Sequence, residues 1–357
     1  MPITSPAGRA RLAARLAMPV LASRHLPRRA AALAAAMLVS GAAAAQELGI
    51  PQGSGLQAGT ASAQAASKSG QTVLMPALTA GAANTLSVLS SQDGANFTSL
   101  ASETWTPPSG KLLDPTLARH ADGRYLLAYA NGAPGGIGLA SSTDLRRWDA
   151  VRDLRLGAGA GVPGTPSWVR GANGQLHLVV SLPLAGGGQG AHVVTPDDKL
   201  ANWPAPLPMR GLDSGYTDTV VVADGDAYVA VAREARSGRL VLARAADITG
   251  PWRIEPQAAL SSLGAGLKAA GLVRLGQTLR LYTRSENGER AWFADSQDGG
   301  RTWSEQRRLS GTAAMASSFG VMGEESKALA KIAAPKGRPK AVTWDQHSLK
   351  IDGKRVV

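Results

Sequence analysis

The sequence repeats one short motif five times at nearly constant spacing. In each copy an aspartate is followed within six residues by a large aromatic side chain, and these aromatic residues are Phe97, Trp148, Trp203, Trp252 and Trp303. Subtracting successive positions gives spacings of 49 to 55 residues. A period near fifty in a chain of short apolar runs is typical of the blades of a β-propeller. The five copies predict five blades.

A pair of strand-like apolar runs separated by a tight turn accompanies each motif. The segments 114–123 and 165–174 align without a gap, and each is followed by a second apolar run. Their turns contain Asp122-Gly123 and Asn173-Gly174, which can adopt the positive φ angles that two-residue hairpins need. The paired runs begin, in chain order, at Asp114, Thr165, Asp218, Lys268 and, in a weaker copy, Leu329.

The two ends of the repeat array complement each other. Residues 84–103 contain only the last two strands of a blade, whereas residues 326–352 contain only the first two. Pairing these ends within one blade closes the ring and removes the exposed sheet edges of an open array. We therefore predict an all-β, five-bladed propeller over residues 73–357, closed by pairing of the N- and C-terminal strands.

The region before the repeats has the composition of an export signal and a linker. Residues 1–45 contain six arginines and no acidic residue, then an apolar run, and end in four alanines. This is the pattern of a secretory signal peptide, so we expect cleavage after Ala45. Residues 46–72 are rich in Gly, Ser, Ala and Gln, which is typical of a flexible linker. We expect a periplasmic or secreted protein with no membrane insertion after cleavage.

The net charge of +12 is carried by the two ends of the chain. The signal peptide and residues 327–357 each contribute +6, so residues 46–326 are neutral. A neutral main body argues against nucleic acid as a partner. The absence of cysteine excludes disulfides and thiol chemistry, and the five scattered histidines show no metal-binding spacing. We expect a monomer without a transition-metal site.

The fifth copy of the motif is the most complete. Ser296-x-Asp298-x-Gly300-x-Thr302-Trp303 matches the Asp-box found in sialidases and other propellers, and the other four copies are degenerate versions. We expect the aspartate to accept hydrogen bonds from backbone N–H groups of the turn, and the tryptophan to pack between neighbouring sheets. The motif is informative about the fold and says nothing about chemistry.

Two carboxylates stand where a ligand would meet a propeller. Asp114 and Asp218 begin the first and third inner strands, which line the central channel. Two carboxylates that converge from different blades could carry out general acid/base hydrolysis of a glycosidic bond. The alternative is that each aspartate caps the start of its strand.

Four segments, 114–117, 123–129, 136–148 and 216–219, resemble the arabinanases and xylosidases of glycoside hydrolase family 43. The resemblance covers roughly residues 84–345. It implies three catalytic carboxyl groups, with Asp114 as the base and Asp218 as the residue that tunes the pKa of a glutamic acid in the fourth blade. It also allows a structural calcium ion in the channel; no other cofactor is expected.

Where the family carries that glutamic acid, this sequence has Lys268-Ala269-Ala270. A lysine cannot replace the carboxylic acid as proton donor, because its ordinary pKa is too high. Either hydrolysis has been lost, or another acid serves. The nearest candidates are Glu324 and Glu325, which we place at the start of the fifth inner strand. Trp105, Trp168 and Tyr216 could stack on sugar rings, with core packing as the alternative for each.

The last 17 residues, 341–357, resemble the opening hairpin of glycoside hydrolase family 35 β-galactosidases. The chain could be the front module of a larger or interrupted galactosidase gene. Alternatively, these strands close the fifth blade.

Three functions remain open at this point. The first is an exported glycoside hydrolase acting on plant-type polysaccharides or oligosaccharides. The second is a non-catalytic sugar-binding propeller, favoured by Ser167 and Lys268 where the family carries acids, and Lys268 could then meet an anionic sugar such as a uronate. The third is a protein-interaction propeller, because this fold hosts many functions.

Overall fold

A computed structural model describes residues 71–79, 84–108, 110–157, 161–256, 260–325, 342–345, 348–351 and 354–356. The signal peptide and nearly all of the expected linker lie outside these residues. The first strand begins at Gln71, two residues earlier than predicted. The helical segments of the described chain are two short 3-10 turns, η2 (Ser261–Leu263) and η3 (Thr312–Met315).

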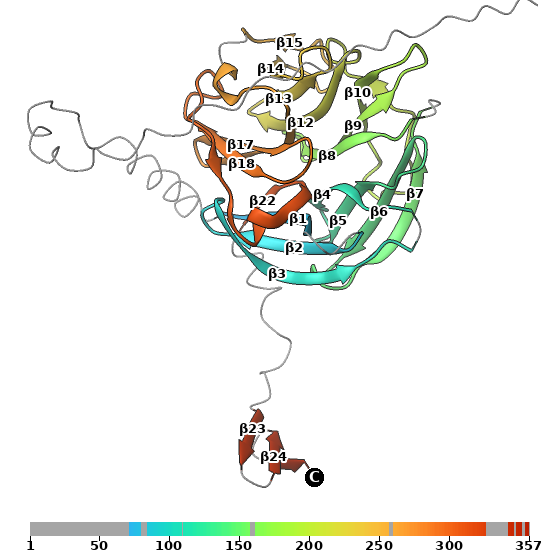
Figure 1. The fold of residues 1–357 in the computed structure, drawn as a ribbon. Helices are drawn as coiled ribbons and strands as arrows, with labels where there is room; N and C mark the ends of the chain where they lie inside the picture. The colour runs from blue at the N-terminus through green and yellow to red at the C-terminus, as the bar shows by residue number, and fades with distance from the viewer. Residues whose placement is uncertain are drawn as a thin grey trace, which may run out of the picture. The chain divides into compact units, whose positions relative to one another are not determined.

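The described residues up to Glu325 form five largely antiparallel sheets around a common axis (Figure 1), which confirms the five-bladed propeller. Blade one consists of β4 (Leu113–Arg119), β5 (Tyr125–Ala130), β6 (Gly136–Ser142) and β7 (Asp149–Arg155). Blade two consists of β8 (Gly164–Arg170), β9 (Leu176–Pro183), β10 (Gln189–Val194) and β11 (Leu207–Pro208).

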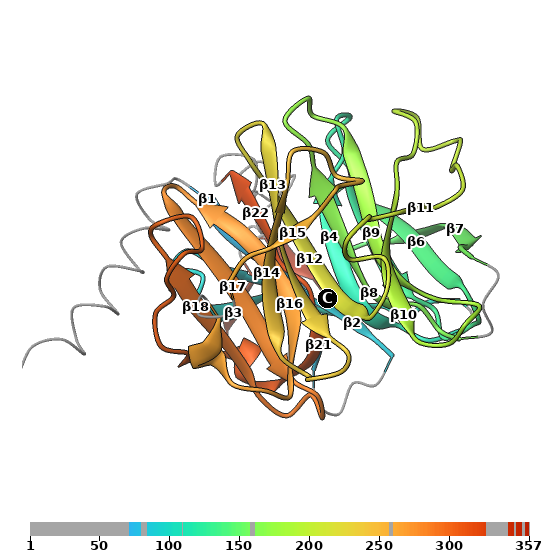
Figure 2. The ribbon, with the colours of Figure 1, turned by 90° about the horizontal axis from the view of Figure 1, so that it is seen from above.

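The next two blades have the same plan. Blade three consists of β12 (Tyr216–Asp224), β13 (Ala227–Glu234), β14 (Leu240–Ala245) and β15 (Arg253–Ile254). Blade four consists of β16 (Leu267–Leu275), β17 (Thr278–Ser285), β18 (Ala291–Ser296) and β19 (Arg307–Arg308). Figure 1 shows the inner strands β4, β8 and β12 near the middle of the ring, and Figure 2 shows the same strands with the ring seen from its edge.

Blade five joins the two ends of the propeller. Its N-terminal part is β1 (Gln71–Thr79), β2 (Leu86–Ser91) and β3 (Asn96–Trp105), and the short β20 (Ser310–Gly311) pairs with β3. The innermost strand comes from the C-terminal side, because β21 (Ala316–Phe319) and β22 (Met322–Glu325) both pair with β1. The predicted closure of the ring by terminal strands is confirmed.

The strands that we assigned to this closure were wrong. We expected residues 326–352 to supply the first two strands of blade five, but residues 316–325 supply the inner strand and β1 already fills the second place. Residues 326–341 lie outside the described chain. The strands β23 (Val342–Asp345), β24 (Ser348–Ile351) and β25 (Lys354–Val356) pair with one another in a separate sheet.

Five apolar cores lie between neighbouring blades, and each contains one aromatic residue of the repeat. Phe97 and Trp148 lie in the cores between blades four and five and between blades five and one. Trp203, Trp252 and Trp303 occupy the three remaining cores in the same way. Burial of one large ring at each interface explains why the aromatic position recurs with the period of the blade.

The aspartates of the repeat act as predicted, since each accepts backbone N–H groups of its own turn. Asp298 accepts from Thr302 N at 2.9 Å and from Thr302 Oγ1 at 2.6 Å. The equivalent acceptors in the other turns are Asp93, Asp144, Asp197 and Asp247. These bonds lower the pKa of Asp298 far below its ordinary value, because they favour the charged form.

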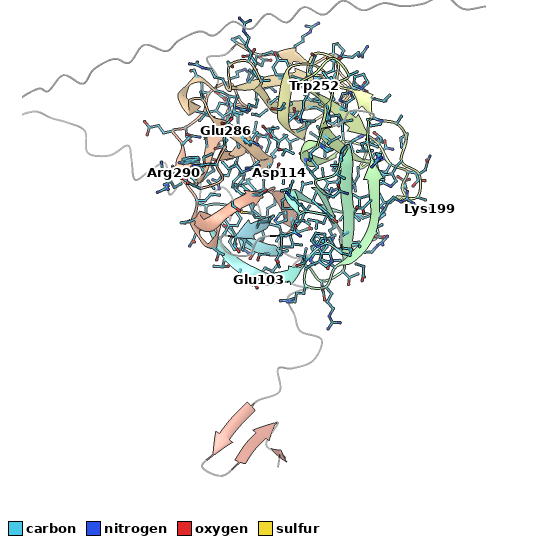
Figure 3. The ribbon with its side chains drawn as sticks, turned by 45° about the vertical axis from the view of Figure 1, so that its right-hand side comes forward. Glu103, Asp114, Lys199, Trp252, Glu286 and Arg290 are labelled. Carbon is cyan, nitrogen blue, oxygen red and sulfur yellow. The ribbon has the colours of Figure 1, made fainter. Side chains whose placement is uncertain are left out.

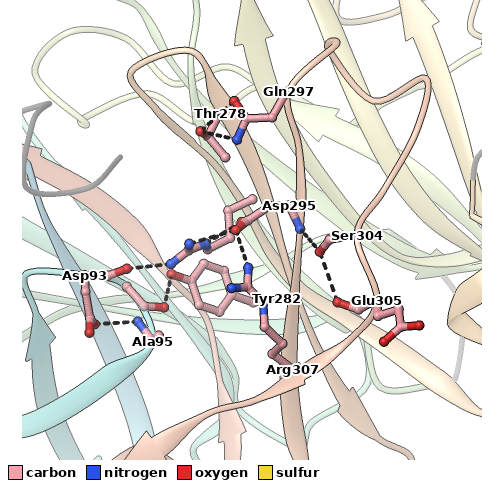
Figure 4. Close-up of polar contacts among 11 residues, drawn as sticks. Asp93, Ala95, Thr278, Tyr282, Asp295, Gln297, Ser304, Glu305 and Arg307 are labelled. Atoms are coloured by element: carbon pink, nitrogen blue, oxygen red, sulfur yellow. Dashed lines mark hydrogen bonds and ion pairs between the residues drawn. The ribbon is translucent and has the colours of Figure 1, made fainter. Parts of the chain in front are cut away.

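A buried ionic cluster joins blade four to blade five (Figure 4). Arg280, which has no exposed surface, donates to Asp295 Oδ1 at 2.6 Å and Oδ2 at 3.0 Å. Its third contact crosses to blade five, where it donates to the carbonyl oxygen of Asp93 at 2.6 Å. Tyr282 donates to the carbonyl of Gly94 at 2.7 Å, and burial raises the pKa of its phenol, so it stays neutral.

Candidate functional site

Four inner strands carry a bulge at the same position, close to where each strand begins. The regular pairing is interrupted and resumes at Thr116 in β4, Ser167 in β8, Val220 in β12 and Gly271 in β16. Two residues before each of these positions stand Asp114, Thr165, Asp218 and Ala269. A bulge turns a side chain out of the regular alternation of the strand. We call this end of the channel the near mouth, and the other end the far mouth.

The two aspartates at these bulges have strained backbones. Asp114 has φ 47° and Asp218 has φ 50°, which is the left-handed region that costs most residues other than glycine free energy. Thr165 stands at the equivalent bulge of blade two and does not have a positive φ angle. The positive φ angles of Asp114 and Asp218 are therefore not required for strand pairing. Such strain is typical of residues whose side chains must point at a ligand.

One hydroxyl group connects the two carboxylates. Thr165 Oγ1 donates to Asp218 Oδ1 at 2.7 Å and lies 3.4 Å from Asp114 Oδ2. Because both contacts share this one atom, the nearest oxygens of the two carboxylates are at most about 6 Å apart, close to the spacings known for pairs in glycosidases. Asp218 is almost fully buried, with 4% of its surface exposed.

Asp114 is held from two further blades. Ser318 Oγ of β21 donates to Asp114 Oδ1 at 2.8 Å and accepts from the Asp114 backbone N–H at 2.9 Å. The guanidinium group of Arg284, on β17, forms an ion pair with the same carboxylate oxygen. The Asp114 side chain keeps 17% of its surface exposed, and Figure 3 shows it near the centre of the ring.

Blade four has no carboxylate at the position that corresponds to Asp114, and it places two positively charged side chains beside that position. The residue equivalent to Asp114 is Ala269, one position further than sequence counting suggested. Lys268 precedes it and lies directly opposite Arg284 across the β16–β17 pair. Directly opposed side chains lie on the same face of a sheet, so Lys268 and Arg284 are neighbours. Asp114 and Asp218 therefore share the near mouth with Lys268 and Arg284, and at the same end of blades three and four Arg233 forms an ion pair with Glu286 of the β17–β18 hairpin.

The structure does not bring Glu324 to this site. Glu324 forms an ion pair with Arg119 at 3.3 Å, and Arg119 is the last residue of β4, whereas Asp114 stands at its start. Five strand residues span roughly 15 Å, so Glu324 lies at the far mouth and cannot act on a bond beside Asp114. The backbone of Glu325 pairs with Gln71 at the same end of the sheet. The expectation that either glutamate supplies the missing acid is corrected.

The three predicted aromatic contacts have different surroundings. Trp168 is buried between blades one and two, with its ring 6.1 Å from that of Trp203. Trp105 ends β3 in the outer part of blade five and packs edge-on against Tyr129 at 5.7 Å. Trp105 is partly buried against the core between blades five and one, and Trp168 also lines the cavity at the far mouth. Tyr216 begins β12 two residues before Asp218 and is half-buried, so it remains a candidate contact at the near mouth.

Three residues of the site were not predicted, namely Thr165, Arg284 and Ser318. Thr165 could have been found, because its segment aligns without a gap on that of Asp114. Arg284 lies on a second strand and carries no sequence signal. Ser318 was missed because the fifth inner strand was placed too late in the chain.

Within the described residues, no group of three or more histidine, aspartate or glutamate side chains is arranged to hold a metal ion. The structural calcium ion that the family resemblance allows stays an expectation. Nor does any helix in this part of the chain have the length and apolar character needed to cross a membrane.

Comparisons with known proteins concern the fold. No protein-family model and no curated protein sequence matches the chain. Solved structures that are similar include an endo-1,4-β-xylanase from Bacteroides thetaiotaomicron, with 13% identity, a TM-score of 0.49, and coverage of 66% of this chain and 93% of that one. An α-L-arabinofuranosidase from Clostridium thermocellum has 12% identity, a TM-score of 0.48, and coverage of 67% and 91%.

A third similar structure is an arabinanase from Bacillus subtilis, with 16% identity, a TM-score of 0.44, and coverage of 66% of this chain and 88% of that one. Sequence identities this low bear on the fold alone. The function is therefore argued from the residues of the near mouth.

Proposed function

We propose that this propeller binds carbohydrate at the near mouth of its channel and does not hydrolyse it. The observation that carries the proposal is the pair of strained aspartates, Asp114 and Asp218, at equivalent bulges of two blades. Their carboxylates lie on either side of the Thr165 hydroxyl group.

The chemistry of this mouth suits a ligand rich in hydroxyl groups. Carboxylates accept strong hydrogen bonds from hydroxyls, and Lys268 and Arg284 can donate to the oxygens of the same ligand. The ion pair with Arg284 and the bonds to Ser318 hold Asp114 in one orientation, which reduces the entropy lost on binding. The resemblance of four segments to glycoside hydrolase family 43 supports a sugar as this ligand.

The absence of hydrolysis is inferred from the composition of the site. Hydrolysis with inversion requires one carboxylic acid that donates a proton and one carboxylate that activates water, on opposite sides of the bond. Blade four, where the family resemblance implies the acid, has Ala269 at the bulge and Lys268 beside it. The Oδ1 atom of Asp114 is already engaged by a guanidinium group and a serine hydroxyl.

A second candidate function is hydrolysis by the two aspartates alone. The burial of Asp218 and the short separation of the two carboxylates favour this possibility, with Asp218 as the proton donor and Asp114 as the second carboxylate.

Affinity electrophoresis in arabinan, xylan and galactan, together with release of p-nitrophenol from arabinofuranoside, xyloside and galactoside, tests both candidates. We expect retardation by at least one polysaccharide, its loss in Asp114→Asn, and no p-nitrophenol release. Asp226→Asn, in the exposed β12–β13 hairpin, is the matched control and should bind normally. Release that is lost in Asp114→Asn would establish the second candidate, and no retardation by any polysaccharide would overturn the binding proposal.

A further inference from the structure

The far mouth of the channel contains a cavity of about 650 Å³. It is lined by residues near the ends of the inner strands, and its polar side chains include Gln71, Arg119, His120, Arg170, Arg274 and Glu324. A cavity of this volume is in the range that holds small-molecule ligands. No residue of the near mouth lines it.

Three of the lining arginines occupy the same position in their blades. Arg119, Arg170 and Arg274 each stand three residues after strand pairing resumes beyond the bulge. In blade three this position is Ala223, and Asp224 follows it. Because equivalent positions of a propeller lie at one height along the axis, the three guanidinium groups come from three blades to one level of the channel.

The fold compensates only part of this charge. Arg119 pairs with Glu324 at 3.3 Å, and Arg274 pairs with Asp224 at 2.5 Å. Arg170 donates to the carbonyl oxygen of Gly174 at 2.6 Å and to that of Arg119, and among the described residues it has no carboxylate partner. Two of the three guanidinium groups are therefore paired with a carboxylate, and that of Arg170 contacts only carbonyl oxygens among the described residues.

His120 forms a fixed part of the wall. Its Nδ1 lies 3.0 Å from Asp122, and its Nε2 lies 2.9 Å from the carbonyl oxygen of Asp198. The imidazole is thus engaged on both nitrogens by the rim of the propeller.

We propose that the far mouth binds a small organic molecule through a carboxylate, sulfate or phosphate group placed among Arg119, Arg170 and Arg274. Guanidinium groups bind such oxyanions through paired hydrogen bonds, and the low dielectric of a channel strengthens this attraction. Glu324 occupies one of these guanidinium groups and competes with the ligand. The proposal is independent of the function of the near mouth, which lies at the other end of the inner strands.

Calorimetric titration of the protein at low ionic strength with sulfate, phosphate and galacturonate tests this site. Arg170→Gln should weaken binding about tenfold or more, because a charge-assisted hydrogen bond is lost. Glu324→Gln should strengthen it, because the competing carboxylate is neutralised. A purely structural role for these residues would produce no gain of affinity. Galacturonate should bind more tightly than sulfate if the cavity holds an organic molecule.

Two control variants complete the experiment. Arg124→Gln removes an exposed arginine of the β4–β5 hairpin that pairs with Asp122 outside the cavity, and Asp114→Asn alters the near mouth. Arg124→Gln should bind all three anions as the wild type does, and Asp114→Asn should bind sulfate and phosphate as the wild type does. The proposal is overturned if none of the three anions binds, if Arg170→Gln binds as the wild type does, or if Glu324→Gln weakens binding. Equal affinity for sulfate and galacturonate would overturn the assignment of an organic ligand.

Discussion

Arg280 and Arg284 lie on the same strand, β17, four residues apart, yet their surroundings differ. Arg280 is completely buried and binds both oxygens of Asp295 and a carbonyl of the next blade, with its guanidinium 4.4 Å from the centre of the Phe293 ring. Arg284 forms an ion pair with one carboxylate at the near mouth, that of Asp114, whose backbone has a positive φ angle. The first contact set stabilises the ring, and the second orients a group that a ligand can reach.

This comparison predicts the largest loss of stability for Arg280. Arg280→Met should lower the free energy of unfolding by about 3–5 kcal/mol, because it leaves the buried Asp295 without its main partner. Urea unfolding followed by tryptophan fluorescence measures the change. A loss below about 1 kcal/mol would mean that the cluster in Figure 4 does not hold blades four and five together.

Arg284→Met should cost less, about 1–3 kcal/mol, because Asp114 keeps its serine partner and some contact with water. The same variant should weaken polysaccharide retardation, since Asp114 is no longer held in place. The comparison between the two arginines fails if Arg284→Met destabilises the protein more than Arg280→Met does.

The aspartates can be divided in the same way. Asp298→Ala should lower the free energy of unfolding by about 1 kcal/mol, because backbone N–H groups of the turn lose their acceptor. Asp218→Asn should change stability less and abolish sugar binding, since asparagine tolerates the left-handed backbone. Thermal unfolding and affinity electrophoresis of both variants show whether the turn aspartate affects mainly stability and the channel aspartate mainly sugar binding.

The smallest effect is a dependence of stability on pH. The turn bonds hold the pKa of Asp298 below the value near 3.9 of an unfolded aspartate, so its stabilisation is complete above that value and is lost as the pH falls below it. The urea midpoint of Asp298→Asn should therefore fall less than that of the wild type between pH 5 and pH 3. Parallel curves for the two proteins would contradict this origin of acid sensitivity.

The features that repeat with the blade could be predicted from the sequence. The five turns, their aspartate acceptors and the aromatic residues of the cores are local, so one blade predicts the next. Asp114 and Asp218 were also identified, because each stands at a recognisable strand start. The fifth inner strand was misplaced because Ala316–Glu325 pairs with β1, far away in the sequence, so no local hairpin marks it, and Glu324 was misassigned with it.

The partners of the site could not be predicted in this way. Arg284 and Ser318 contact Asp114 across 170 and 204 residues of sequence. No local pattern records such contacts, since they arise only when the ring closes and brings blades one, four and five to one mouth. The sequence already showed that blade four has no carboxylate where the family resemblance implies one. Which residue corresponds to Asp114, namely Ala269, became clear only from the pairing of β16 with β17.

A crystal structure of the protein soaked with the oligosaccharide that corresponds to its best-retarding polysaccharide tests the central claim most directly. The account predicts an intact oligosaccharide at the near mouth, with hydroxyl groups bonded to Asp114 and Asp218. An oligosaccharide bound elsewhere, or one that has been cleaved at this mouth, would contradict the account.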